Sequence, residues 1–206
     1  IIPDYGADGG PRRWTNEEGW KIDLLDGYVV ITAASVVGCD GVEHPMDLSF
    51  GPVVEHLLFT DRDVITFGTT KVEEGELCKV IVEYGPYRAE EAALVASPFP
   101  IPTKVDLEGK SVFLSGVATR DEEKVGFVLT SAATQTIEID LRAPGGGPAP
   151  YAIAASGSGG KVTVAKTYDA FFRGVDFATV DQDALAGELV ARIAGETAAY
   201  HGTTAY

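Results

Sequence analysis

The 206-residue sequence has little of what several classes of protein require. It contains two cysteines, three histidines and one methionine, and it has 16 basic residues compared with 31 acidic ones. Its longest apolar runs have the length of a strand, which argues against a membrane span. The net charge of -15 argues against nucleic acid and anionic lipid surfaces as partners, because both bind basic patches. Acidity of this kind is typical of a protein dissolved outside a cell; a calcium-collecting surface is the alternative.

Motifs that carry catalysis are also missing. The stretch Ser156-Gly-Ser158-Gly resembles a nucleophile elbow only as a loop, since no strand-to-helix turn follows it. No glycine loop for phosphate opens a helix, and no zinc-type cysteine cluster is present. Paired carboxylates for sugar cleavage stay open as an alternative, because acidic residues are many and none is marked out. We therefore predict that the chain is not an enzyme.

What is present is a series of strand-like runs organised around residues 20–39. Trp20, Ile22 and Leu24 alternate with polar residues, which predicts a strand with one face in water. After an expected turn at Asp26-Gly27, the unbroken β-branched run over 28–37 predicts a strand covered on both faces. The high content of glycine (24) and proline (11) is typical of many short strands joined by turns.

The fold class predicted from these runs is mainly β, an antiparallel β-sandwich with one C-terminal α-helix. We expect an N-terminal arm or linker at 1–19, a single sandwich domain at 20–196 and a tail at 197–206. Two hairpins are predicted, one turning at 120–123 and one joining 151–155 to 161–165. The helix is expected to begin with a capping box of Thr179 and Gln182. Its predicted apolar face is formed by Leu185, Leu189, Val190 and Ile193.

The two cysteines predict a disulfide between Cys39 and Cys78. In the loop-entropy model, closing a loop of about 40 residues contributes roughly 4 kcal/mol. The alternative is a pair of buried, reduced thiols in a cytosolic protein. The sequence begins at Ile1 without methionine, which indicates a removed leader or a trimmed chain. We expect a secreted, periplasmic or cell-surface protein.

One small group of residues suggests a metal site. His44, Met46 and His56 lie close in sequence, and imidazole and thioether ligands suit copper better than calcium or magnesium. Asp47 and Trp20 are potential neighbours of this site. The alternative interpretation is a surface-loop histidine and a core methionine. Residues 4–8, where two aspartates lie near glycines, suggest a calcium-binding loop. The suggestion is weaker, because the alternating oxygen ligands of such a loop are missing.

Several stretches resemble the MbnP-like and MopE-like family of secreted copper-binding β-sandwich proteins. They are the early strand that ends near Cys39 and the segments 72–80, 107–116 and 168–177. The resemblance implies one copper ion held by two histidines and an oxidised tryptophan, with a di-haem peroxidase as the partner that oxidises it. Trp14 is the freer candidate for that modification, whereas Trp20 is expected in the core.

The chain departs from the family pattern near its tryptophans. Family sites place a histidine two residues after the modified tryptophan, but Asn16 follows Trp14 and Ile22 follows Trp20 at that spacing. Two functions therefore remain as hypotheses. The first is a copper-binding protein without catalysis of its own. The second is an extracellular structural or assembly subunit that binds copies of itself or other chains through its N-terminal arm or edge strands.

Overall fold

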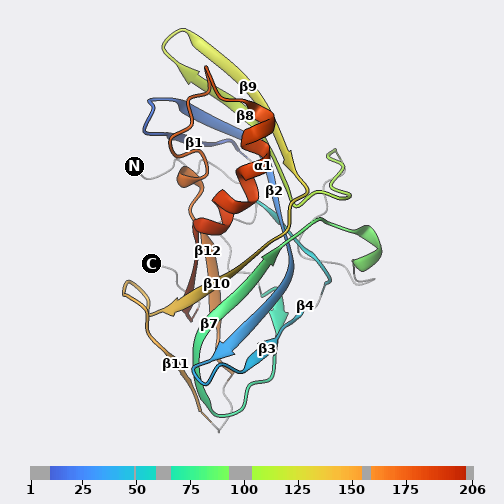
Figure 1. Cartoon of the computed structure of the whole chain (residues 1–206), viewed down its shortest axis with the longest axis vertical. Coiled ribbons are helices and arrows are strands. Elements are labelled where there is room, and N and C mark those ends of the chain that lie inside the picture. The colour runs from blue at the N-terminus through green and yellow to red at the C-terminus, as the bar shows by residue number, and fades with distance from the viewer. Residues whose placement is uncertain (1–9, 49, 59–65, 93–103, 155–158, 203–206) are drawn as a thin grey trace.

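The structure is a computed structural model, and it describes residues 10–48, 50–58, 66–92, 104–154 and 159–202. β-strands dominate these residues, and a single α-helix lies near the C-terminus (Figure 1). The predicted fold class, a mainly β, sandwich-like fold with one C-terminal helix, is confirmed. No helix among the described residues is long and apolar enough to cross a membrane.

The elements follow one another in chain order. The strands are β1 (Arg12–Thr15), β2 (Lys21–Gly38), β3 (Glu43–Pro45), β4 (Asp47–Leu48), β5 (Val53–His56), β6 (Gly68–Thr69), β7 (Gly75–Tyr84), β8 (Val112–Arg120), β9 (Glu123–Ser131), β10 (Gln135–Arg142), β11 (Tyr151–Ile153), β12 (Val162–Lys166) and β13 (Thr197–His201). The helices are α1 (Gln182–Gly195) and the short 3-10 turns η1 (Ala89–Glu91) and η2 (Tyr168–Ala170). The main sheet has the strand order β12-β13-β10-β7-β2-β8-β9, while β4 and β6 form a separate pair.

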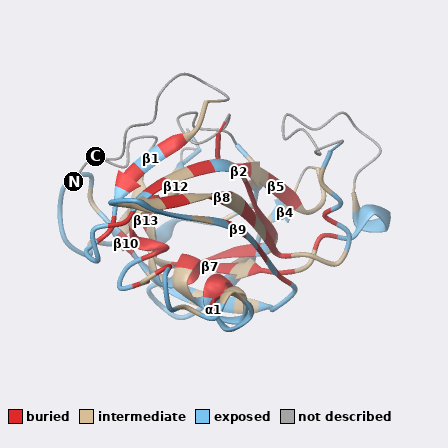
Figure 2. Ribbon diagram, turned by 90° about the horizontal axis from the view of Figure 1, so that it is seen from above, coloured by how far each residue is buried: buried red, intermediate tan, exposed pale blue. Residues whose placement is uncertain are grey.

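The 18-residue strand β2 is shared by the two halves of this sheet. Its first part pairs with β8 on one edge and with β1 and β5 on the other. Its last part pairs with β7 on the edge that β8 occupies earlier in the strand, and with β3 on the other edge. A strand that bends from one layer into another is a known way to build the corner of a sandwich. The layer with β8 and β9 and the layer with β7 and β10 enclose the buried interior (Figure 2).

Two irregularities in β2 decide which side chains face the main core. Register shifts occur between Leu24 and Asp26 and between Ile31 and Ala33. Each extra residue moves the following side chains to the other face of the strand. The core residues accordingly change from even positions (20, 22, 24) to odd positions (29, 31) and back to even (36). The turn predicted at Asp26-Gly27 is wrong, because β2 continues through a bulge there.

A second, smaller apolar cluster covers the opposite face of β2. Tyr28, Val30 and Val54 pack there beneath Tyr87 and Leu107. Their neighbours on the other face, such as Val29, belong to the main core. The predicted burial of this stretch on both faces is therefore confirmed for residues 28–31.

The helix is confirmed with a different cap. Asp181, rather than Thr179, is the N-cap, and its carboxylate accepts hydrogen bonds from the amides of Asp183 at 2.9 Å and Ala184 at 3.3 Å. Aspartate at this position satisfies amides that have no partner inside the helix. The four apolar residues predicted for one face are all buried, and α1 lies against β9 and β10.

Both predicted ends of the domain differ from the structure. β1 belongs to the sheet, so the expected N-terminal arm of 1–19 contributes a strand, while residues 1–9 lie outside the described part. β13 pairs with both β12 and β10, so the expected tail also enters the sheet. The sequence could not show the second of these, because β13 is stabilised by pairing with strands distant in the chain.

Of the two predicted hairpins, one is confirmed. β8 and β9 pair without a register shift from the pair Val112–Ser131 to the pair Arg120–Glu123. In the turn between them Asp121 adopts a φ of 53°, a left-handed conformation that aspartate tolerates better than most residues. The second is wrong, because β11 pairs with β7 and β12 pairs with β13.

The predicted disulfide is present. Cys39 follows β2 directly, and Cys78 lies in β7, with their Cα atoms 4.9 Å apart. The amide of Cys39 also donates to the carbonyl of Glu76 at 2.8 Å. The bond thus links two strands that are already neighbours at the far end of β2.

Candidate functional site

The two histidines predicted as copper ligands lie at different places along β2. His44 pairs with Val36, and His56 pairs with Tyr28. These β2 positions are eight residues apart, which corresponds to about 26 Å along an extended strand. A metal such as zinc binds an imidazole nitrogen at about 2 Å. The structure therefore does not bring His44 and His56 to one ion within a chain.

The other residues of the predicted metal site have different surroundings. Met46 packs against the main core, and Asp47 is exposed on β4. Within the described ranges, no group of three or more histidine, cysteine or acidic side chains is placed to hold a metal ion. Asp4 and Asp8, on which the calcium suggestion depended, lie outside the described residues.

Both tryptophans are buried. Trp20 is in the core, as predicted, and its indole Nε1 donates to Asp176 at 3.0 Å. Trp14 stacks on Phe172 with ring centroids 6.0 Å apart. Its Nε1 is buried without a hydrogen-bond partner among the described residues. The expectation that Trp14 is the freer of the two is not supported, since its ring is enclosed by the core.

The buried His56 belongs to a contact between β5 and the bulge of β2. Its Nε2 lies 3.0 Å from Asp26 Oδ1, and its ring stacks on Tyr28 with centroids 4.4 Å apart. Burial, together with the negative charge of Asp26, raises the pKa of Tyr28 to about 12. The ring of His201 is half-buried and lies 2.7 Å from the carbonyl of Ala149. These contacts hold strands and loops together.

The most distinctive surface is the outward side of β1, β2, β8 and β9. Along these strands, residues that face the core are buried and the residues between them are partly or fully exposed. The pairing registers place the outward residues side by side. We call this surface the outer face; it consists of Arg13, Thr15, Lys21, Asp23, Leu25, Asp26, Ser115, Val117, Thr119, Lys124, Gly126, Val128 and Thr130.

The outer face has a composition unlike that of the whole chain. It has two acidic residues: Asp23, which accepts a hydrogen bond from Arg13 Nε at 2.8 Å, and Asp26, which lies 3.0 Å from His56 Nε2. Two further basic residues, Lys21 and Lys124, are exposed. Three large apolar side chains are exposed among the described residues. Two of them lie here: Leu25 is 49% exposed and Val128 is 66% exposed. The outer face is therefore weakly basic and partly apolar on a chain of net charge -15.

The same side of the sheet is covered further along the strands. Phe113 and Tyr28 continue the surface past Ser115, and there the segment containing Tyr87 and Leu107 packs over it. The chain thus buries one half of this side under its own residues and leaves the other half open. Open apolar area of this kind often marks a binding surface.

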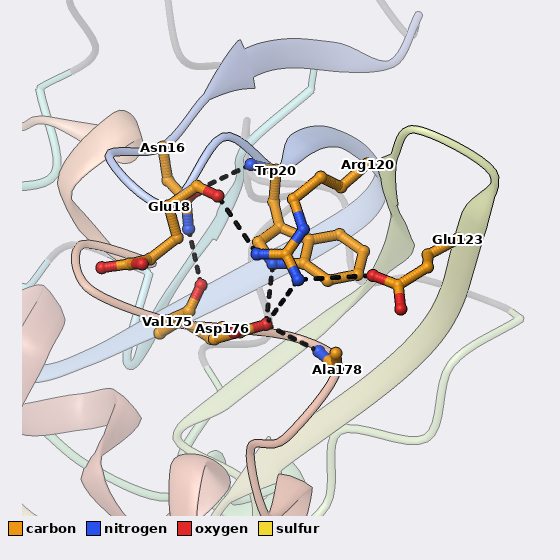
Figure 3. A network of polar contacts seen from close by, with 8 residues as sticks. All are labelled: Asn16, Glu18, Trp20, Arg120, Glu123, Val175, Asp176 and Ala178. Atoms are coloured by element: carbon orange, nitrogen blue, oxygen red, sulfur yellow. Dashed lines mark hydrogen bonds and ion pairs between the residues drawn. The ribbon is translucent and has the colours of Figure 1, made fainter.

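A polar network holds the end of the β8–β9 hairpin in place (Figure 3). The guanidinium carbon of Arg120 lies 4.4 Å from the centroid of the Trp20 ring. Its Nη2 is 3.4 Å from Asp176 and 3.3 Å from Glu123, and its Nη1 donates to the carbonyl of Glu18 at 3.3 Å. The hydrogen bond from the amide of Ala178, together with those from Trp20 and Arg120, lowers the pKa of Asp176 although partial burial opposes this.

Asn16 ties the same region to the loop before α1. Its side-chain amide donates to the carbonyls of Phe172 at 3.0 Å and Val175 at 2.8 Å, and its Oδ1 accepts from the amide of Trp20 at 3.0 Å. All three contacts are buried, where an unpaired polar group would be costly. These buried contacts thus hold the strands of the outer face in place on their core-facing side.

A second charged group lies inside the molecule. Lys166 of β12 and Glu55 of β5 form an ion pair of 2.6 Å with side chains 4% and 19% exposed. Burial disfavours the ammonium, but Glu55 and the hydroxyl of Tyr84 outweigh it and raise the pKa of Lys166. The Tyr84 hydroxyl in turn lies 2.7 Å from Thr197 Oγ1. This group joins β5 to β12 and β13 and is largely buried.

The scan against protein-family models found no match. The searches of curated proteins and of solved structures found no significant match either. The resemblance to the MbnP-like family therefore stays a prediction from short stretches of sequence.

Sequence reasoning did not identify the outer face. The signal that could have found it is the alternation in residues 112–130, where Val117 and Val128 fall between the core positions of the two strands. An apolar residue on the water-facing side of a predicted hairpin is the feature to look for.

Proposed function

We propose that the protein is an extracellular structural or assembly subunit, without catalysis of its own, that binds another protein chain on its outer face. The observation that carries this proposal is the exposure of Leu25 and Val128 on a rigid sheet surface with few acidic residues. Burying apolar surface contributes roughly 25 cal/mol per Å². The strands are already ordered, so binding there costs little conformational entropy.

The chain's own packing supports the choice of this surface. Where Tyr87 and Leu107 cover the neighbouring half of the same side, they form a continuous apolar cluster with β2 and β5. A partner on the open half would extend that cover. The binding surface proposed is this sheet face rather than a free N-terminal arm, because Arg12–Thr15 is part of the sheet.

An extracellular location is supported by the disulfide, since such bonds persist in oxidising compartments. The absence of catalysis is proposed because His56 and His201 are engaged in contacts between strands and loops. Copper binding stays a prediction from the family resemblance. The separation of His44 from His56 along β2 does not support a site that both would share.

The test is site-specific photo-crosslinking in the organism that produces the protein. A photoreactive amino acid placed at Val128 is expected to give one adduct of defined mass with a neighbouring chain. The matched control is the same substitution at Thr136, an exposed residue of β10 outside the outer face. Equal crosslinking at the two positions, or none at Val128, would contradict the proposal.

A further inference from the structure

The third exposed large apolar side chain lies at the opposite end of β2. Val42 is 50% exposed in the turn between β2 and β3. This turn lies beside the one that precedes β7, because Cys39 is joined to Cys78 and its amide donates to Glu76. We call these two turns the acidic end; its exposed acidic residues are Asp40, Glu43, Glu73, Glu74 and Glu76.

The acidic end is complementary to the outer face. Residues 38–43 and 73–78 contain five carboxylates and no lysine or arginine. The outer face contains three basic residues and two acidic residues, Asp23 beside Arg13 and Asp26 beside His56. Each surface has exposed apolar side chains among its charges, Val42 on one and Leu25 and Val128 on the other.

The two surfaces lie too far apart to meet within one chain. The outer face includes the start of β2 at Lys21, and the acidic end follows Gly38. An extended strand of this length measures about 55 Å. Figure 1 shows the β8–β9 hairpin near one end of the long axis and β3 and β11 near the other.

We infer that the chain bound on the outer face is a second copy of this protein, docked through its acidic end. This inference rests on the proposed function and names its partner. The contact joins two different surfaces, so it is heterologous, and repetition builds a ring or an open row of copies. Val42 would pack near Leu25 and Val128, with carboxylates of one copy facing Lys21 and Lys124 of the next.

Long-range repulsion opposes this contact. Each copy has a net charge of -15, and the turns beyond the outer face carry Glu17, Glu18, Asp121 and Glu122. At an ionic strength of about 0.15 M, charges more than about 8 Å apart are largely screened. Contacts at shorter distance then decide the outcome, and the association should be measured at that salt concentration.

The experiment is sedimentation velocity of the purified chain over a concentration series, using two complementary charge reversals. The face variant carries Lys21→Glu and Lys124→Glu, and the end variant carries Glu73→Lys and Glu76→Lys. We expect oligomers of the natural sequence that grow with concentration, and about tenfold weaker association of each variant alone. An equimolar mixture of the two variants should associate again, because reversed and natural surfaces are then complementary.

The matched control for the face variant makes the same change in net charge outside both surfaces. Lys104→Glu with Lys161→Glu replaces two exposed lysines there and should leave association unchanged. Val42→Ser, which keeps every charge, should weaken association from the acidic end alone. Circular dichroism of each variant verifies the fold.

A monomeric natural chain at every concentration, or failure of the variant mixture to associate, would overturn the inference. If the chain is monomeric but Val128 still crosslinks to a different protein in the producing organism, the inference fails and the proposed function stands. If Val128 also gives no adduct above the Thr136 control, both fail.

Discussion

Lys166 and Arg120 have similar partners in opposite surroundings. Each is a cation beside an aromatic ring and a carboxylate: Lys166 lies near Tyr84 and Glu55, and Arg120 lies over Trp20 near Asp176. The Lys166 side chain is 4% exposed, whereas that of Arg120 is 29% exposed. The same chemistry therefore occurs once inside the fold and once at its edge.

This difference shows how burial changes the contribution of an ion pair to the stability of the fold. Removing one member of a buried ion pair leaves an uncompensated charge away from water, which typically costs about 3–5 kcal/mol. An exposed pair loses little, because water replaces the missing partner, and it contributes about 0–1 kcal/mol. Four changes, taken from the largest expected effect to the smallest, test this comparison.

Breaking the inner group should have the largest effect. Lys166→Met leaves Glu55 without its partner, and we expect the free energy of unfolding to fall by about 3–5 kcal/mol. Chemical denaturation measures this loss. Adding Glu55→Leu should recover much of it, because the double variant buries no charge. A single variant as stable as the natural chain would show that the pair is solvated.

The disulfide provides a covalent comparison at the exposed acidic end. Replacing both Cys39 and Cys78 by serine should lower the free energy of unfolding by about 2–4 kcal/mol, because the unfolded chain gains freedom. Denaturation of the double variant, beside the natural chain with and without reductant, measures the effect. If reductant destabilises the double variant equally, the loss is not due to the bond.

Breaking the outer group should cost less. Arg120→Met keeps the aliphatic stem over Trp20 but removes the charge, and we expect a loss of about 1 kcal/mol. The comparison with Lys166→Met in the same denaturation experiment is the measurement. A loss as large as that of Lys166→Met would contradict the difference drawn from burial.

The smallest effect concerns Asp176 and depends on pH. Its pKa is lowered from the ordinary value of 3.8 by hydrogen bonds to its carboxylate, so its contribution to stability is present above pH 3.8. The contribution is lost as the pH falls through the lower folded-state pKa. Asp176→Asn should therefore be less stable than the natural chain near neutral pH, and the gap should narrow in acid. Thermal unfolding over a pH series measures it; a constant gap would contradict this origin.

Much of the fold could be predicted because its signals are local. The β-branched run after Tyr28, the pairing of Cys39 with Cys78 and the apolar face of α1 each depend on residues close in sequence or on a single choice of partner. The bulge of β2 near Asp26 resembles a turn in the sequence, because one extra residue and a turn both interrupt alternation. The capping-box pattern predicts Thr179 as the cap, whereas Asp181 is the cap in the structure; both side chains can accept hydrogen bonds at a helix start, so the pattern does not separate them.

The candidate site could not be predicted in the same way. Alternation in β8 and β9 shows which residues share a face, but whether that face is open depends on packing by a distant segment such as the one with Tyr87 and Leu107. The proximity of His44 and His56 in sequence was misleading for a related reason. Both pair with β2, and the register sets them eight β2 residues apart.

The path of β2 also has a mechanical consequence. The strand runs the length of the molecule, paired first with β8 and then with β7. If copies join end to end, tension in the row passes through β2 from one contact to the next. Its ladder hydrogen bonds lie across the direction of pull, so they are sheared together rather than peeled one by one. Resistance to stretching would then depend on how fast β2 slips past its neighbours.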